Sequence, residues 1–444
     1  GNFLAGQFAM SAGDPATAAQ DFLRALATDP GNKDLLTQAF MASVSAGRPE
    51  AVRLARQLPD NQVAQLVITN DDMKAGRWQA AEKRLHGLPR QGLTQLLQPL
   101  MLAWVQQGDG RTDAALTTLR PYVESPRLRG IFALHAAMIA DVANRTQEAG
   151  RLYDIAQAEM PELTLRLAQI LASWQARNGN AAGARAIMAD MTSGALDSSI
   201  ALQGLTAAMA KRAVTRATDG GAEAYIALAA ALRAQGANDF AGVMVRLALD
   251  LRPDFAAGRL LQSDIETVRN RPATALLALN GIPDDNPIAA LIRLRRVTLQ
   301  ERLGHTDEAL RDLNKLIRDY PNSPVPEIQL GDMMRLKQRF PEAISAYSRA
   351  IALMPSPART DWPVFYNRGV SYERSGQWPK AEADFDRALE LAPDQPSVLN
   401  YLGYSWADMG RHLDRALEMI QRAAARRPND GAIVDSLGWV MFKQ

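Results

Sequence analysis

Small and apolar residues recur along this chain with one fixed spacing that is typical of a helix face. A small residue is followed four positions later by an apolar residue, and three positions after that by another small or apolar residue. These three positions lie on one stripe of an α-helix, where alanine lets a neighbouring helix approach closely. A proline five positions further on cannot continue the helix and therefore marks its end. Seven segments share this pattern, each with 12 residues from alanine to proline: Ala18, Phe22, Ala25, Pro30; Ala149, Tyr153, Ala156, Pro161; Ala241, Val245, Ala248, Pro253; Ala309, Leu313, Leu316, Pro321; Ala343, Tyr347, Ala350, Pro355; Ala381, Phe385, Ala388, Pro393; and Ala416, Ile420, Ala423, Pro428.

A second amphipathic segment precedes each stripe. Its apolar positions are clearest at Phe365, Gly369 and Tyr372, and again at Leu399, Leu402, Gly403 and Trp406. A glycine commonly separates the two segments, and glycine readily adopts the left-handed conformation of a helix C-cap. These glycines are Gly13, Gly304, Gly376 and Gly410. The pattern therefore predicts a series of helix–turn–helix units.

The proline intervals predict the number of units. Pro321 and Pro355 are 34 residues apart, which is one repeat, whereas Pro161 and Pro253 are 92 apart, or two repeats plus 24 residues. The surplus predicts one extra helix near residues 198–216, ending at Asp219-Gly220-Gly221. Between Pro30 and Pro161 the motif is degenerate, but two stripes survive without a closing proline: Ala81, Leu85, Leu88 and Ala115, Leu119, Tyr122. We count twelve repeats and the first helix of a thirteenth.

The predicted organisation has three parts. Residues 1–196 form an N-terminal degenerate array, residues 197–221 an inserted helix or linker, and residues 222–444 a C-terminal array whose last repeat is truncated. Trp439, Val440 and Phe442 do not give the final helix the polar outer face that a terminal repeat needs. We therefore expect the natural protein to continue beyond Gln444.

The repeats resemble the tetratricopeptide (TPR) signature W-x2-L-G-x2-Y…A-x3-F…P. The resemblance is strongest from Pro326 to Pro428, where Phe365 and Leu399 replace the signature tryptophan, while Val297 replaces the glycine of an earlier repeat. It implies an all-α fold, the TPR α-solenoid, in which helix pairs stack into a right-handed superhelix with a concave binding surface.

Composition and motifs argue against catalysis. The chain has no cysteine, which excludes disulfides, thiolate nucleophiles and cysteine-based metal sites. No H-E-x-x-H, G-x-S-x-G, Walker or G-x-G-x-x-G motif is present. The four histidines fall in different repeats: His86, His135, His305 and His412. We therefore expect no enzyme activity and neither a metal nor a cofactor.

Length and charge favour a binding protein over a nucleic-acid or membrane protein. A single core stops growing at about 250–300 residues, so 444 residues with 47% hydrophobic content fit an extended repeat array. Net charge is +2, and the densest basic cluster is best interpreted as a solvated helix face: Arg293, Arg295, Arg296 and Arg302. No apolar run reaches the roughly 18–20 residues of a membrane span.

The resemblance also implies which residues bind a partner. In TPR proteins, positions 2, 5, 9, 12 and 13 of each first helix line the concave face. Aromatic rings interleaved with amides and charges suit peptide recognition; the alternative is that some of these rings pack between repeats. The carboxylate clamp of chaperone-binding repeats is not expected, because its lysine and asparagine positions hold other residues. The predicted partner-binding residues are Tyr366, Glu373, Arg374, Asn400, Tyr404, Asp408, Asp435 and Trp439.

A narrower resemblance concerns the stretches 399–406 and 435–439. They are similar to those of large Gram-negative cell-envelope TPR lipoproteins that act as adaptors for carboxy-terminal processing proteases. This implies a periplasmic adaptor that binds such a protease and its substrates, tethered to the outer membrane through a lipidated cysteine upstream of Gly1. The alternatives are a TPR scaffold for polysaccharide export or cytoplasmic regulation, and the regulatory arm of an enzyme whose catalytic domain lies outside this chain.

Overall fold

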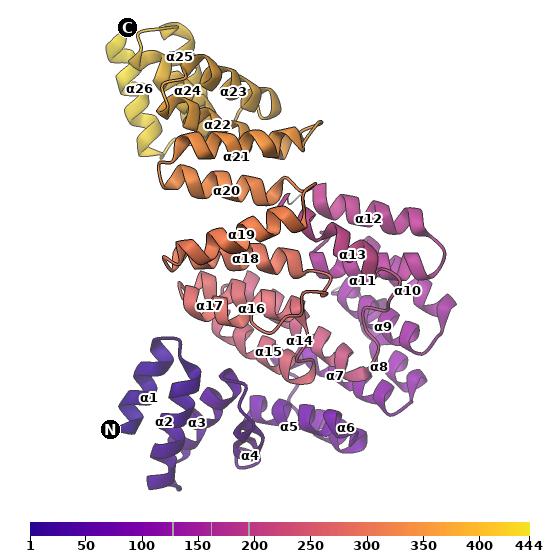
Figure 1. Ribbon diagram of the computed structural model, residues 1–444. Helices are drawn as coiled ribbons and strands as arrows, with labels where there is room; N and C mark the ends of the chain where they lie inside the picture. Colours follow the sequence, from indigo (N-terminus) through magenta and orange to yellow (C-terminus); the bar gives the residue numbers. More distant parts are fainter. Residues whose placement is uncertain (127, 161, 194–195) are drawn as a thin grey trace. The chain divides into compact units, whose positions relative to one another are not determined.

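The amphipathic segments of the sequence form α-helices, and the arrangement is an α-solenoid (Figure 1). A computed structural model describes residues 1–126, 128–160, 162–193 and 196–444, and within these ranges there is no β-strand. The helices up to the inserted segment are α1 (Asn2–Ser11), α2 (Pro15–Thr28), α3 (Lys33–Ser45), α4 (Glu50–Ala55), α5 (Gln62–Lys74), α6 (Trp78–His86), α7 (Leu93–Gly108), α8 (Thr112–Glu124), α9 (Arg129–Val142), α10 (Thr146–Glu159), α11 (Leu165–Arg177) and α12 (Ala181–Ser193).

The remaining helices continue in the same alternation. They are the 3₁₀-helix η1 (Leu196–Ala201), α13 (Leu202–Ala208), α14 (Ala217–Ala234), α15 (Asn238–Leu251), α16 (Ala256–Val268), α17 (Pro272–Ala278), α18 (Ala289–Arg302), α19 (Thr306–Asp319), α20 (Val325–Leu336), α21 (Phe340–Ala352), η2 (Arg359–Asp361), α22 (Trp362–Arg374), α23 (Trp378–Leu391), α24 (Pro396–Asp408), α25 (Leu413–Arg426) and α26 (Gly431–Lys443). In chain order, and with α13 set aside, the described α-helices make twelve pairs and the single α26. This count confirms the number of repeats predicted from the proline intervals.

The stripes that define the repeats are buried in the structure. All small and apolar members of the seven stripes are among the buried residues, and Ala381, Phe385 and Ala388 have no exposed surface. Phe385 lies against Gly369 of the preceding helix, where an added Cβ would approach its ring to 2.8 Å. The repeat glycine therefore makes room for the aromatic ring of its partner helix. Pro161, which closes the second stripe, lies outside the described residues.

Local signals start and end the helices as expected. Asp14 caps α2 by accepting a hydrogen bond from the Thr17 amide at 3.0 Å, and Pro15 occupies the first helical turn. The turn glycines have positive φ, for example +73° at Gly376. This confirms the predicted left-handed C-caps.

Contacts divide the chain into two compact units. Unit 1 comprises residues 1–188 and 203–304, and unit 2 comprises residues 189–202 and 305–444. Residues 222–304, which the sequence groups with the C-terminal array, therefore belong to the unit that contains the N-terminal helices. The sequence-based domain boundaries at residues 196 and 222 stay a prediction.

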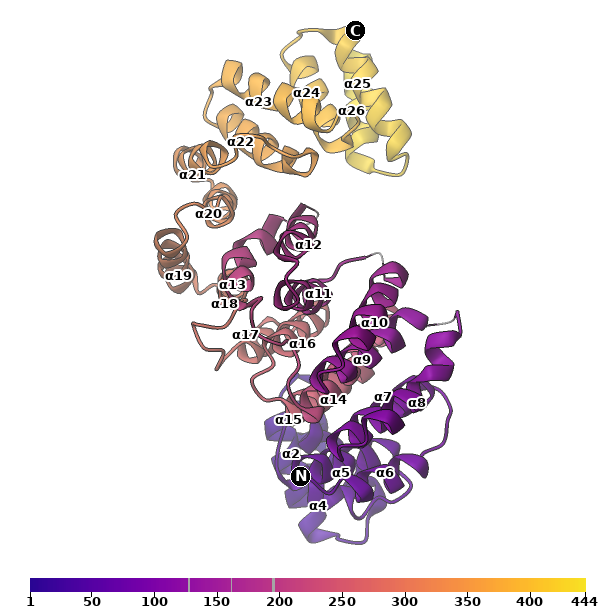
Figure 2. The same cartoon turned by 90° about the vertical axis from the view of Figure 1, so that its right-hand side faces the viewer.

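In unit 1 the chain folds back on itself. Helix α14 packs against α7 and α9, and α15 packs against α3 and α5, although long stretches of sequence separate them (Figures 1 and 2). The helices contacted are the first helices of their pairs. The face that a TPR array usually offers to a ligand is therefore occupied here by a later helix pair of the same chain.

The inserted segment differs in detail from the expectation. An extra helix is present as α13, preceded by η1, in the region where the surplus residues predicted one. Asp219, Gly220 and Gly221 do not end this helix, because α14 begins at Ala217. The glycines serve close packing: a Cβ at Gly220 would lie 2.1 Å from the Trp104 ring.

Candidate functional site

Three helices of unit 2 carry the eight predicted partner-binding residues. Tyr366, Glu373 and Arg374 lie on α22, while Asn400, Tyr404 and Asp408 lie on α24, and Asp435 and Trp439 lie on α26. Helix α24 packs directly beside α26. We call these eight residues the C-terminal groove face.

Half of the C-terminal groove face is well exposed. Tyr404 has 43% of its surface exposed. Arg374, Asp408 and Asp435 are also exposed. An exposed ring flanked by charged side chains has the composition of a small protein-interaction patch.

The other members are partly buried and are held in place by neighbours. Glu373 accepts a hydrogen bond from the Tyr401 hydroxyl at 3.1 Å. Among the described residues, Asn400 Oδ1 and Trp439 Nε1 are buried without a hydrogen-bond partner. Buried polar atoms normally have partners, so these two atoms are exceptions within the face.

Tyr366 does not present its ring as a free surface. Its ring centroid lies 5.9 Å from that of Trp362, 6.0 Å from Phe385 and 5.8 Å from Tyr401. Burial raises the pKa of its hydroxyl. Tyr366 therefore fits the alternative that some of these rings pack between repeats, and its neighbours make it part of an aromatic cluster.

The end of α26 extends the apolar part of the face. The rings of Trp439 and Phe442 stack with centroids 5.8 Å apart, and the Lys443 ammonium lies 4.8 Å from the Trp439 ring centroid. Phe442 is 79% exposed. This pair offers an aromatic surface with a cation above it.

Trp406, one of the apolar positions of its amphipathic segment, lies behind the face. It is only 2% exposed, its Nε1 donates to Glu382 at 2.6 Å, and the Arg415 guanidinium lies 4.9 Å from its ring centroid. Trp406 thus supports α24 from within, two residues away from the exposed Tyr404.

One exposed apolar residue at position 13 of a first helix was not among the predicted partner-binding residues. Leu336, at the end of α20, is 74% exposed. Gly331 occupies the repeat-glycine position, since a Cβ there would lie 2.6 Å from the Tyr347 ring. Counting five residues on from Gly331 reaches position 13, so the signal was in the sequence.

The equivalent face of unit 1 is covered by its own chain. Asn70 on α5 donates to the Leu247 carbonyl at 3.0 Å and accepts from the Tyr225 hydroxyl at 3.0 Å, with no exposed surface. Trp104 on α7 is fully buried against Gly220. Among the described residues, these side chains on the first helices of unit 1 thus pack against other helices of the same chain.

Membrane-spanning helices and metal-binding clusters are both absent from the described residues. Within residues 1–126, 128–160, 162–193 and 196–444, no helix has the length and apolarity needed to cross a bilayer. Nor do three or more histidine or acidic side chains of these ranges gather in a way that could hold a metal ion.

Comparison with known proteins identifies the repeats. Residues 293–323 and 362–395 each match the family described as tetratricopeptide repeat. A TPR repeat-containing protein of Pseudomonas aeruginosa is 26% identical over 191 residues, which are 43% of this chain and 31% of that protein. The Hsp70-Hsp90 organizing protein of Triticum aestivum is 29% identical over 189 residues, which are 40% of this chain and 32% of that protein. The chain spans less than a third of the length of these relatives.

Solved structures with similar folds include the APC/C hetero-tetramer Cut9-Hcn1. It is 13% identical and covers 99% of this chain and 95% of its own, with a TM-score of 0.43. The structure of pilF from Pseudomonas aeruginosa is 16% identical, with a TM-score of 0.41, over 50% of this chain and 98% of its own. Such low scores carry no functional argument. The helical architecture and the matched repeats nevertheless agree: this chain carries tetratricopeptide repeats and folds as an all-α TPR solenoid.

Proposed function

We propose that this chain is a non-catalytic adaptor that binds a partner protein or peptide on the C-terminal groove face. The observation that carries the proposal is the exposed Tyr404 at the centre of α24, flanked by Asn400 and Asp408. Aromatic side chains at such positions supply large contact area at low conformational cost and dominate many interfaces.

The polar residues around this ring suit a peptide backbone. Asn400 is only partly buried, and its side-chain amide carries both donor and acceptor groups. Arg374, with 63% of its side chain exposed, supplies a cation at the same edge. Such a face fits an extended segment with an apolar anchor and alternating polar groups.

The contrast with unit 1 supports this choice of face. In unit 1 the first-helix positions pack against α14 and α15. In unit 2, Tyr404 and Phe442 remain exposed at the corresponding positions. An incoming partner meets no competing segment there among the described residues of that unit.

We propose that the adaptor acts in the bacterial cell envelope, with a carboxy-terminal processing protease and its substrates as partners. Support comes from the stretches 399–406 and 435–439, which resemble envelope TPR lipoproteins. The similarity to a Pseudomonas aeruginosa repeat protein agrees with a bacterial setting.

A cytoplasmic adaptor is the second candidate, favoured by the similarity to Hsp70-Hsp90 organizing proteins. Recognition by a carboxylate clamp is not expected, because its lysine and asparagine positions hold other residues. These positions hold Tyr366 and Val370 in one repeat, and Asn400 and Tyr404 in the next. Fractionation of the native host separates the candidates: the envelope proposal expects the protein with the membrane and periplasm, and recovery in the cytosol alone contradicts it.

The affinity test uses Tyr404→Ala against the processing protease encoded in the same genome. Loss of a hot-spot ring typically costs about 2 kcal/mol or more, roughly thirtyfold in affinity. Phe240→Ala, which removes a 54% exposed ring from α15, is the matched control and should bind like the parent chain. Equal affinity of Tyr404→Ala and Phe240→Ala for a protease that binds the parent would refute the assignment of this face, and no binding by the parent would refute the protease as partner.

A further inference from the structure

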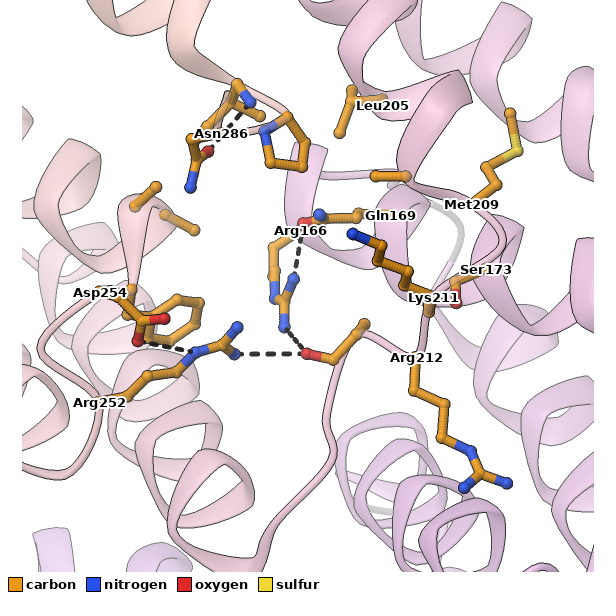
Figure 3. Close-up of a pocket in the computed structure, with 17 residues that line it drawn as sticks. Arg166, Gln169, Ser173, Leu205, Met209, Lys211, Arg212, Arg252, Asp254 and Asn286 are labelled. Carbon is orange, nitrogen blue, oxygen red and sulfur yellow. Dashed lines mark hydrogen bonds and ion pairs between the residues drawn. The ribbon is translucent and has the colours of Figure 1, made fainter. Parts of the chain in front are cut away.

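Unit 1 contains a cavity that the repeat pattern does not account for. It has a volume of about 170 Å³ and lies between α11, the segment that follows α13, and the turns that precede α16 and α18 (Figure 3). Its residues take no part in the C-terminal groove face. Two of its walls come from the inserted segment and from a turn between helix pairs, so the cavity is a product of the insertion.

The floor of the cavity is formed by an arginine whose guanidinium already donates several hydrogen bonds within the protein. Arg166 on α11 donates through Nε to Glu223 Oε1 at 2.8 Å, through Nη1 to Gln169 Oε1 at 2.6 Å and through Nη2 to the Ala213 carbonyl at 3.0 Å. These contacts fix the guanidinium and engage Oε1 of the Glu223 carboxylate, which is itself buried.

The positive charge of a second arginine at the floor of the cavity, Arg252, is less well balanced by nearby carboxylates than that of Arg166. Arg252 shares the Ala213 carbonyl at 3.3 Å, and its nearest carboxylate oxygens, on Glu223 and Asp254, are 3.7 and 3.8 Å away. Its guanidinium lies 4.7 Å from the Phe255 ring centroid. Burial, with the neighbouring Arg166 adding to it, lowers the pKa of Arg252. A cation in this position gains from an additional negative group.

Two more donors face the same space. The Lys211 ammonium points toward Arg166 in Figure 3, and the described residues place no carboxylate within ion-pairing distance of it. Across the cavity, Asn286 uses its Oδ1 to accept from the Ile288 amide, which leaves the amide nitrogen as its remaining polar group. Arg212 does not contribute, because it turns away and pairs with Asp141 at 3.1 Å.

The rest of the lining is apolar. Leu205, Met209 and Pro287 border the cavity beside the donors. The one acidic side chain among the lining residues, Asp254, has 76% of its side chain exposed and belongs to the solvent side. The cavity thus combines hydrogen-bond donors and positive charge with room for an aliphatic group.

We propose that this cavity, formed by Arg252, Lys211 and Asn286 above Phe255, is a binding site for a carboxylate that adjoins an aliphatic group. A carboxylate accepts charge-assisted hydrogen bonds from arginine and lysine, and these are stronger than bonds between neutral groups. Either a chain-terminal carboxylate or an aspartate or glutamate side chain beside an aliphatic residue presents this chemistry. The site is separate from the proposed adaptor face, so each can fail without the other.

The test uses three N-acetylated tripeptides and ligand-detected NMR titration with the full chain. The first ends in leucine with a free carboxylate, the second is its C-terminal amide, and the third is an amidated peptide with glutamate next to leucine. We expect saturable binding of the first peptide, the third or both, and none of the second. Binding by the first or the third tells which source of carboxylate the site takes, whereas equal binding of the amide, or no binding at all, overturns the proposal.

Two substitutions tie the binding to the cavity. Arg252→Gln should weaken it about tenfold or more, since a hydrogen bond to a charged group is lost. Lys211→Gln alters an exposed side chain and leaves the fold intact, and its expected effect is about threefold to fivefold. Lys33→Gln, at an exposed lysine of α3, is the matched control and should not change binding. If Lys211→Gln folds and binds like Lys33→Gln, the carboxylate does not occupy this cavity.

Discussion

Gly220→Ala should destabilise unit 1 strongly, although alanine normally favours a helix. Gly220 lies in the first turns of α14, and an added Cβ would lie 2.1 Å from Cε2 and 2.2 Å from Cδ2 of Trp104. Atoms of a side chain that is 0% exposed cannot move aside freely. The substitution must shift α14 or rotate the Trp104 ring.

The magnitude follows from three contributions. Overpacking of a core costs typically about 1–3 kcal/mol. Rotation of Trp104 would also break its buried hydrogen bond from Nε1 to His135 Nδ1, which is 2.9 Å long, at a further cost of about 1–3 kcal/mol. Replacing glycine by alanine within a helix returns about 1 kcal/mol. The expected net loss in free energy of unfolding is about 1–5 kcal/mol.

Gly242→Ala is the matched control, because Gly242 also lies inside a helix of unit 1. The nearest atom to its added Cβ is Arg269 Nη1 at 3.6 Å, an ordinary contact. It should be neutral or stabilising by about 1 kcal/mol. Urea unfolding followed by tryptophan fluorescence and far-ultraviolet circular dichroism measures both variants. If Gly220→Ala unfolds at the same urea concentration as Gly242→Ala, α14 does not pack on Trp104 as described.

Three further predictions concern buried groups. Trp406→Ala should lower the free energy of unfolding by about 3–5 kcal/mol, measured by chemical denaturation, because it removes a ring that is 2% exposed; a loss below about 1 kcal/mol contradicts the burial. Tyr225→Phe should cost about 1–3 kcal/mol in the same assay, since it leaves the buried Asn70 Oδ1 without its donor, and an unchanged midpoint would count against that bond. Burial lowers the pKa of His135 to about 3, so only the unfolded state takes up its proton as pH falls below about 6.5. The free energy of unfolding should therefore fall as the pH drops from about 6.5 toward 3, by up to about 1.4 kcal/mol per pH unit for this group. His135→Gln should make the urea midpoint less dependent on pH between about pH 6.5 and 5. A parallel decline of the midpoint in both proteins would be inconsistent with a buried neutral imidazole.

The repeat architecture could be predicted from the sequence because its determinants are local. Each stripe, such as Ala381, Phe385 and Ala388, needs only the 3.6-residue period to define its buried face. Each turn glycine needs only its own positive φ. Because a repeat packs mainly on its neighbours along the chain, such local patterns are enough to define helix pairs and their order.

The candidate face was only partly determined in this way. The position within a repeat identified both Tyr366 and Tyr404, yet one ring packs against Phe385 and Tyr401 while the other is 43% exposed. Which of the two rings is covered depends on the side chains of the adjacent repeat. A periodic pattern places a side chain on a face but does not say what lies above it.

Only the tertiary structure decided where the chain returns upon itself. The bond between Asn70 and the Leu247 carbonyl joins residues 177 positions apart, and the contact of Gly220 with Trp104 also spans several repeats. Nothing in the local period specifies such pairings, because they depend on how successive helix pairs curve and on which later pair fills the resulting space. The cavity between Lys211 and Arg252 has the same origin. Its lining comes from α11, the segment that follows α13 and two turns between helix pairs, so the pattern of a single repeat does not specify it.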